Sequence, residues 1–317
     1  MTTTRRRLGV SILVAVGLAL TACGDDGSTA TPATTAPAPT TAPAPAPAPV
    51  QHLDIVGREY LFEVQPDPGA GLVPGWTSLT FANEGVEAHQ VMFARLKDGV
   101  DLAELSEVAG DDSSGAAAIA YVDMLGGVSY IGPGQTTTAM VDLAEGTVVA
   151  MCYVPDPDGV AHALSGMTTL LTVGDDAGSA SPGSATAGAP EPDEVAGTIG
   201  LTADGYRIPD QLTRGWYRVV NEDEGTDGFG LHELSILRLE REATPEELDQ
   251  LMADLAANAT PAIALEAVGG LGAISPGFEG YLHLDLPPGD YVAVDFMPDP
   301  GEARPHLLDG YWTAFSQ

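Results

Sequence analysis

The sequence has few cysteines, few basic residues and few aromatic residues, and these shortages exclude several classes of function. Its 317 residues include 2 Cys, and Lys and Arg number 12 against 45 Asp and Glu. A chain this acidic lacks the clustered cations that displace counterions from a phosphate backbone, so nucleic acid is excluded as a partner. No catalytic Ser/His/Asp order, nucleotide-binding loop or zinc motif is visible, and we therefore expect no enzyme. Hydrophobic residues reach 44%, which is enough for two packed domains.

The apolar run near the N-terminus is too short for a comfortable membrane span. It covers residues 8–20, follows Arg5-Arg6-Arg7 and ends in Leu20-Thr21-Ala22-Cys23, whereas a span needs about 20 apolar residues. These features are typical of an export signal. The ending resembles the lipobox of bacterial lipoproteins, which implies a signal peptide over 1–22 and acylation of Cys23. The resemblance implies a lipid anchor on the extracytoplasmic face of the bacterial cell membrane; a plain secreted protein is the alternative.

Two low-complexity stretches divide the rest of the chain. Residues 23–51 are mostly Thr, Ala and Pro, and residues 174–197 are rich in Gly, Ala, Ser and Pro. Neither composition buries enough apolar surface to fold, so we expect a disordered stalk and an interdomain linker. Segments 52–173 and 198–317 remain as two candidate domains.

The two segments are copies of one another. Each position from His89 to Pro157 meets its counterpart 143 residues later without a gap. The clearest matches are His89 with His232, Gly126-Gly127 with Gly269-Gly270, and Pro155-Asp156-Pro157 with Pro298-Asp299-Pro300. Agreement over this length indicates a duplicated domain.

Each copy is expected to be an all-β sandwich. In the first copy, short runs rich in β-branched or apolar residues lie between turn residues, at 77–81, 89–96, 136–143, 148–153 and 168–173. Many short strands with frequent turns are typical of Greek-key sandwiches. A short helix is expected in each copy, because Thr244-Pro245-Glu246-Glu247 forms a capping box and 101–104 occupies the same place in the first copy.

Four residues of the first copy form a candidate metal site: His89, Cys152, His162 and Met167. Cys152 closes one strand and Met167 opens the next, so the turn between them crosses one end of the sandwich. His89 begins a strand that can reach the same end. Two imidazoles, a thiolate and a weak thioether are the ligands of blue copper. Taken singly, each residue also has a structural explanation, as packing or as a local hydrogen-bond partner.

The pattern Asn-x-Gly-x-x-x-His, followed by Cys and then His-x4-Met, resembles the type 1 copper motif of the cupredoxin family. The resemblance covers most of residues 55–173 and, by duplication, 198–317. It implies two tandem cupredoxin-like sandwiches and one copper ion in the first. His89, Cys152 and His162 would be the strong ligands and Met167 the weak axial one.

Two departures from related patterns bear on the chemistry. Nine residues separate Cys152 from His162, more than in small copper carriers of the family. Met151 and Tyr153 flank the cysteine, where copper nitrite reductases and multicopper oxidases place histidines for further copper ions. The resemblance therefore implies electron transfer or copper holding, with a redox or copper-delivery protein as partner.

The second copy has lost the thiolate. Asp295 stands in place of Cys152 and Tyr311 in place of Met167, while His232 and His306 remain. His232, Asp295 and His306 are weaker candidates for a divalent ion, and a degenerate site kept for structure is the alternative. Because this copy retains the fold without the full ligand set, a non-metal cell-envelope interaction module is the competing hypothesis for the whole chain.

Overall fold

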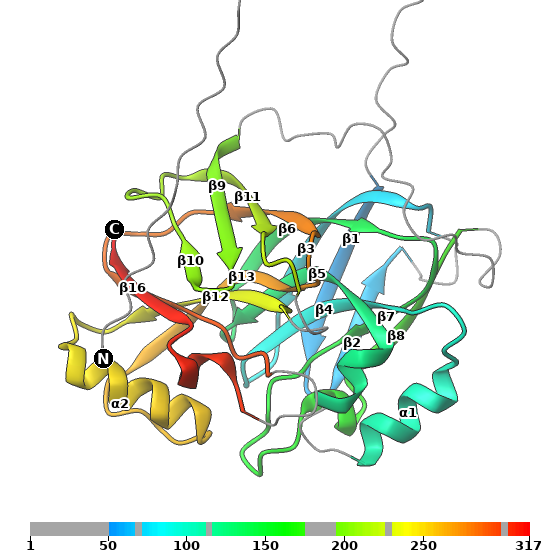
Figure 1. Ribbon diagram of the computed structural model, residues 1–317, viewed down its shortest axis with the longest axis horizontal. Helices are drawn as coiled ribbons and strands as arrows, with labels where there is room; N and C mark the ends of the chain where they lie inside the picture. The colour runs from blue at the N-terminus through cyan, green and yellow to red at the C-terminus, as the bar shows by residue number, and fades with distance from the viewer. Residues whose placement is uncertain (1–50, 67–71, 112–115, 175–194, 226–229, 299–303) are drawn as a thin grey trace, which may run out of the picture. The chain divides into compact units, whose positions relative to one another are not determined.

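The structure is a computed structural model that describes residues 51–66, 72–111, 116–174, 195–225, 230–298 and 304–317 (Figure 1). The expected signal peptide, the lipidation site at Cys23 and nearly all of both expected linkers lie outside these ranges. The described residues belong to one compact unit. None of the helices in these ranges combines the length and the apolar character needed to cross a membrane.

The first half folds into two packed sheets of four strands each. One sheet has the order β2-β1-β3-β6 and the other β5-β4-β7-β8. The bounds are β1 Gln51–Arg58, β2 Leu61–Gln65, β3 Gly75–Asn83, β4 His89–Leu96, α1 Leu102–Asp111, the 3-10 turn η2 Ala116–Tyr121, β5 Val122–Ile131, β6 Thr136–Leu143, β7 Gly146–Met151, the 3-10 turn η3 His162–Ser165 and β8 Thr168–Val173. The chain crosses between the sheets after β3, β5 and β6, as in a Greek-key sandwich.

The second half repeats this plan with the orders β10-β9-β11-β14 and β16-β15-β12-β13. Its elements are β9 Val195–Thr202, β10 Gly205–Arg207, β11 Gly215–Asn221, β12 His232–Leu239, α2 Pro245–Ala256, β13 Leu265–Ile274, β14 Glu279–Leu284, β15 Asp290–Val294, the 3-10 turn η5 His306–Asp309 and β16 Trp312–Ser316. The predicted all-β sandwich class is confirmed for both halves. Strand β9 begins within the range expected as linker, because its residues pair in parallel with β11.

The two halves share both sheets, through pairing of equivalent strands. Strand β13 runs antiparallel to β5, and β14 runs antiparallel to β6. Val128 pairs with Leu271, its own counterpart 143 residues later, and Ala139 pairs with Leu282 in the same way. Pairing of a position with its own copy is the signature of a two-fold, isologous interface. The duplicated sandwiches therefore join as a pseudo-dimer within one chain.

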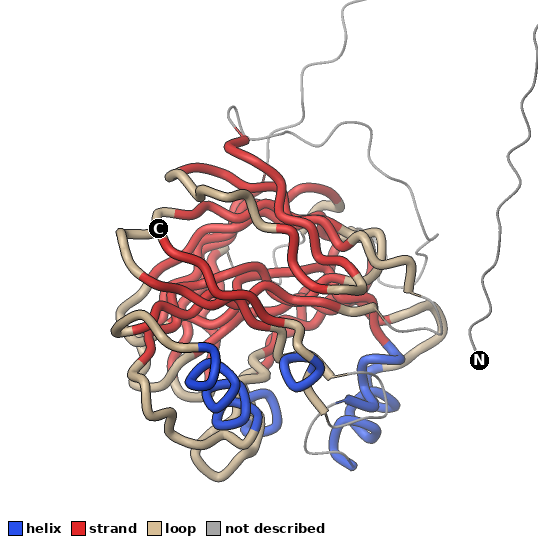
Figure 2. The backbone as a smooth tube through the Cα atoms, turned by 60° about the vertical axis from the view of Figure 1, so that its left-hand side comes forward, coloured by secondary structure: helices blue, strands red, loops and turns tan. Residues whose placement is uncertain are grey.

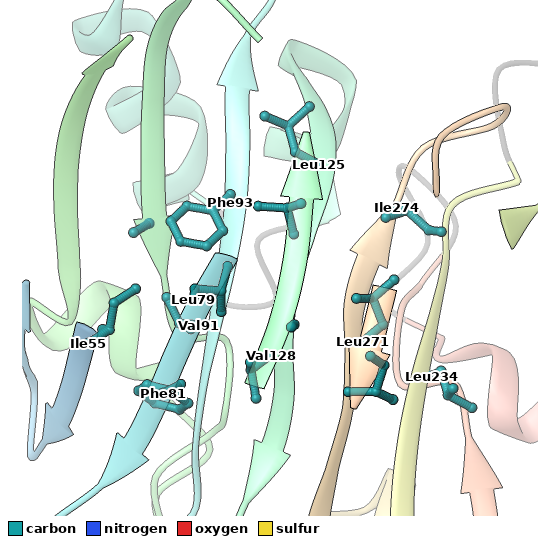
Figure 3. Close-up of a cluster of buried hydrophobic side chains, with 14 of the residues drawn as sticks. Ile55, Leu79, Phe81, Val91, Phe93, Leu125, Val128, Leu234, Leu271 and Ile274 are labelled. Carbon is teal, nitrogen blue, oxygen red and sulfur yellow. The ribbon is translucent and has the colours of Figure 1, made fainter. Parts of the chain in front are cut away.

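The hydrophobic core is built from two kinds of strand: strands with one buried face and strands that are buried on both faces. Strand β3 alternates buried and half-buried residues, as expected for a strand with one face inward. All residues of β4, which lies between β5 and β7, are buried. Figure 3 shows side chains of this core on strands of both halves, with Val128 and Leu271 on neighbouring strands. Because β5 and β13 pair with each other at the junction, neither half presents either strand as an open edge.

The predicted helical insertions are present in both halves and lie on one side of the strands (Figure 2). In α2 the capping box forms as expected: the Thr244 hydroxyl accepts from Glu247 N, and Thr244 N donates to the Glu247 carboxylate at 2.9 Å. Leu248, Leu251 and Met252 are buried on its inner face. The helix therefore covers apolar positions of the sheet that contains β12 and β15.

Candidate metal centre

The structure brings three of the predicted ligands of the first half together. His89 is the first residue of β4, Cys152 follows the last residue of β7, and His162 is the first residue of η3. Each offers one ligand atom, and these three atoms all lie within 4.8 Å of one another. All three side chains are completely buried, with 0% exposure. The three side chains thus converge inside the protein at one end of the sandwich.

The atoms that face one another are the two imidazole Nδ1 atoms and the thiol sulfur. His89 Nδ1 lies 3.2 Å from His162 Nδ1, and Cys152 Sγ lies 3.5 Å from His162 Nδ1. Metal–nitrogen bonds of about 2.0 Å and metal–sulfur bonds of about 2.3 Å place ligand atoms of a shared ion roughly 3.3–3.8 Å apart. The separations of 3.2 and 3.5 Å are close to that spacing, so the donor set suits a single small metal ion.

Met167, the predicted axial ligand, is fully buried and belongs to the same segment. Its backbone N donates to His162 O at 2.9 Å, and Cys152 N donates to Met167 O at 3.2 Å. Gly166, at the end of η3, has a left-handed φ of 110° that turns the chain back towards β8. These two hydrogen bonds hold the backbone of Met167 beside the backbones of His162 and Cys152.

The long stretch between Cys152 and His162 closes on itself. Asp156 Oδ1 accepts from the backbone N atoms of Asp158 and Val160, each at 2.9 Å, and Pro155 forms a bridge with Ala161. Below this turn, His162 N donates to Val154 O and Ala163 N donates to Cys152 O. The extra residues therefore protrude as a separate turn, and the distance between cysteine and histidine stays short.

Two glutamates that sequence reasoning missed lie against the outer nitrogens of the histidines. Glu87 Oε2 is 2.9 Å from His162 Nε2, and Glu59 Oε1 is 3.4 Å from His89 Nε2. Among the residues that the structure describes, neither Nε2 atom has a partner at hydrogen-bond angles, although the separations from the two glutamates are those of ion pairs. Glu87, two residues before His89, was visible in the motif; Glu59, in the turn between β1 and β2, carried no signal.

These carboxylates favour the imidazole tautomer that a metal needs. A neutral imidazole protonated at Nε2, towards its glutamate, keeps the lone pair on Nδ1. Two such Nδ1 lone pairs 3.2 Å apart repel each other unless a cation lies between them. Carboxylate–histidine–metal chains of this kind are the usual outer support of metal sites.

Burial sets the protonation states of the ligands. Burial lowers the pKa of His89 and of His162, and the neighbouring glutamates raise it by less. Both rings are therefore neutral at neutral pH. Burial raises the pKa of the Cys152 thiol to about 12. Burial also opposes ionisation of Glu59, but the backbone N–H groups of Val86 and Glu87 outweigh it and hold its pKa at about 2. The rings are thus ready to bind a metal, and the thiol must release its proton to do so.

The loop before His89 is held by Asn83, the first residue of the motif. Its side-chain amide donates to Glu87 O at 2.7 Å and to Ile131 O at 2.9 Å, and its Oδ1 accepts from Gly85 N. Asn221 makes the equivalent bonds in the second half, to Gly230 O and Ile274 O. The asparagine therefore positions the histidine strand in both halves, which is a structural role.

The second half also gathers its three candidate residues. His232 begins β12, Asp295 follows β15 and His306 begins η5, and their ligand atoms lie within 4.8 Å of one another. Tyr311, in the place of Met167, stacks on the His232 ring with centroids 4.3 Å apart. A hard carboxylate thus takes the place of the soft thiol between the two imidazoles.

Solved structures that the chain resembles include one described as a copper protein. An auracyanin from the photosynthetic bacterium Roseiflexus castenholzii is 21% identical, covers 41% of this chain and 100% of its own, and has a TM-score of 0.25. Auracyanin A, a "blue" copper protein from Chloroflexus aurantiacus, is 19% identical over 39% and 98%, with a TM-score of 0.28. Lac15, from a marine microbial metagenome, is 15% identical over 82% and 66%, with a TM-score of 0.24.

No protein-family model matches the chain, and none of the curated proteins matches it. The fold is cupredoxin-like: each half is a sandwich of two four-stranded sheets with a short helical insertion. The all-β sandwich that the resemblance of the sequence motif implied is present in both halves. What the chain binds is a separate matter that depends on its own residues.

Proposed function

We propose that this chain is an extracytoplasmic, lipid-anchored copper protein that transfers electrons or holds copper. One copper ion would be bound in the first half by His89, Cys152 and His162, with Met167 as the weak axial ligand. The observation that carries this proposal is the buried group of two Nδ1 atoms and one sulfur at separations of 3.2 and 3.5 Å. Copper supplies a one-electron couple, which thiolate and thioether ligands suit.

The surroundings of the site support a carrier more than a catalyst. The three strong ligands are fully buried, which suits an ion that exchanges electrons through the protein surface more than one that binds a substrate. The two residues that flank the cysteine, Met151 and Tyr153, have no metal-binding imidazole. We therefore propose a non-enzymatic role, with a redox or copper-delivery protein of the cell envelope as partner.

Titration with Cu(II) tests the proposal. We expect one equivalent of copper to produce an intense blue thiolate-to-copper absorption, because Cys152 is the only cysteine among the described residues. Visible spectroscopy with metal analysis measures both the band and the stoichiometry. A chain that stays colourless at saturating copper would contradict the proposal.

The competing hypothesis is a cell-envelope interaction module without a metal. The second half favours it, because the same fold persists there with a carboxylate in place of the thiol. A chain whose stability and spectrum are unaffected by copper would support this alternative. Membrane attachment through Cys23 belongs to both hypotheses and does not separate them.

Replacing Glu87 with glutamine should weaken Cu(II) binding about 10-fold, because outer-shell partners of metal-bound histidines contribute 10- to 100-fold. Loss of the negative charge beside His162 favours the lower-charged Cu(I). If the loss falls on Cu(II) alone, the reduction potential rises by about 59 mV for a tenfold change. Competition titration and cyclic voltammetry measure the two effects.

The matched control is Glu104→Gln, which neutralises an exposed carboxylate on α1. It should leave both the potential and the affinity unchanged. Equal potentials for the two variants would show that Glu87 has no electronic influence on the site.

A further inference from the structure

The second half contains a buried His–Asp–His cluster whose geometry needs a positive charge. Asp295 Oδ2 lies 2.8 Å from His232 Nδ1 and 2.9 Å from His306 Nδ1. Asp295 is completely buried, and its other oxygen accepts from Met297 N at 2.9 Å. One carboxylate oxygen therefore faces two imidazole nitrogens at the place where the first half has its thiol.

The other ring nitrogen of His232 also faces a carboxylate, which strengthens the need for a positive charge. His232 Nε2 lies 3.2 Å from Asp223 Oδ2, so the ring is placed between two carboxylates. A neutral imidazole has one N–H and one lone pair. If the N–H points to Asp223, the Nδ1 lone pair faces a carboxylate oxygen at 2.8 Å, and the two repel. If the N–H is instead on Nδ1 and donates to Asp295, the Nε2 lone pair faces the Asp223 carboxylate at 3.2 Å, so each neutral tautomer leaves one lone pair against a carboxylate.

Only a cation removes that repulsion, and nearby basic side chains do not supply one. In the part of the chain that the structure describes, the ion pairs of Asp223 and Asp295 are with histidines. The positive charge must therefore be a second proton on the ring or a metal ion. Two imidazoles and a carboxylate are ordinary ligands of Zn²⁺, with bonds of about 2.0–2.2 Å. The separations of 2.8 and 2.9 Å in this cluster are hydrogen-bond lengths, so the three ligand atoms would move apart to roughly 3.3 Å around a tetrahedral ion.

We propose that the second half binds Zn²⁺ through His232 Nδ1, His306 Nδ1 and the Asp295 carboxylate. Asp223 accepts the Nε2 proton of His232 and so keeps the Nδ1 lone pair available, as outer carboxylates do in zinc sites. Without a thiolate or thioether, the site has lost the soft ligands that favour Cu(I). The duplicated chain would thus carry a redox-active ion in one half and a redox-inert ion in the other.

Binding is tested in a Cys152→Ser background, because the thiol of the first half would itself take Zn²⁺. We expect the Cys152→Ser chain to bind one equivalent of Zn²⁺, measured by calorimetry and by metal analysis. Adding Asp295→Asn should lower the affinity by at least about 10-fold. The control Asp249→Asn removes an exposed carboxylate on α2 and should have no effect.

Spectroscopy on the Cys152→Ser chain decides the question even if the Asp295→Asn variant does not fold. The zinc X-ray absorption spectrum should show nitrogen and oxygen ligands with two imidazoles, and no sulfur. Failure of this chain to bind Zn²⁺ would overturn the proposal. So would a nitrogen NMR spectrum in which His232 keeps both ring protons in excess Zn²⁺, since the bridging cation is then a proton.

Discussion

The Cys152→Ser chain is expected to lack the blue absorption entirely and to bind copper at least about 100-fold more weakly. The loss should exceed the 10- to 100-fold effect of outer partners, because the sulfur would contact the ion directly. A serine hydroxyl has nearly the same shape, but it is a hard donor and does not ionise at neutral pH. Visible spectroscopy and competition with a copper chelator measure the two losses.

The fold should tolerate this substitution, so the test reports on the metal site. Cys152 belongs to the apolar core cluster, and its Sγ accepts from Gln90 N at 3.5 Å and lies 3.5 Å from His162 Nδ1. A serine hydroxyl that failed to make these contacts would cost about 1–3 kcal/mol. The control Cys23→Ser removes the other cysteine and should leave the blue band intact. A band of full intensity in the Cys152→Ser chain would rule out thiolate ligation.

Gly127→Ala is expected to lower the free energy of unfolding by about 2–4 kcal/mol, because an alanine cannot adopt the glycine's positive φ without strain. Gly127 has a φ of 136°, and a Cβ there would lie 2.0 Å from Val91 O on the neighbouring strand. That contact is backbone, so relief requires β4 and β5 to separate. Because Val91 lies two residues after His89, copper affinity should fall as well.

The midpoint of thermal unfolding should fall by roughly 5–15 °C, taking about 2–4 °C per kcal/mol for a chain of this size. Circular dichroism measures it. Gly132→Ala is the matched control, because its φ is not left-handed and the nearest atom to an added Cβ is 3.6 Å away. If both variants unfold at the same temperature, the close approach at Gly127 is not a constraint.

The counterpart Gly270 is subject to the same limit. Its φ is 148°, and a Cβ there would lie 1.8 Å from Leu234 O. Both copies thus keep a glycine where two backbones meet closely, which explains why the Gly-Gly pair survived duplication. Since β5 and β13 are paired across the junction, strain in either strand affects both halves.

Local sequence patterns predicted much of the secondary structure. The runs at 89–96, 136–143 and 168–173 coincide with β4, β6 and β8, and the capping box marks the start of α2. Strand β5 was not predicted, because two glycines interrupt its pattern. Strand β1 was not predicted either, and its first residue, Gln51, lies in the range expected as stalk.

The sequence also named the residues that meet at the candidate copper site, since their order along the chain and the strand boundaries are local properties. Of the two glutamates beside the histidines, Glu87 lies within the motif, but its contact with His162 and the whole contribution of Glu59 could not be read from the sequence. Glu59 lies in a turn far from His89 along the chain, and nothing in residue type or spacing indicates that contact. Side-chain approach between distant segments depends on how the sheets pack.

By itself, the sequence determined the duplication, the all-β class and the two sets of candidate ligands, because these depend on composition, repetition and residue order; the export signal stays a prediction from the same kind of pattern. Only the tertiary structure decided that the two copies share their sheets through β5–β13 and β6–β14. Any exposed strand edge can pair with any other by the same backbone hydrogen bonds, and which edges meet is settled by the packing of whole faces. The same packing placed carboxylates around each pair of histidines.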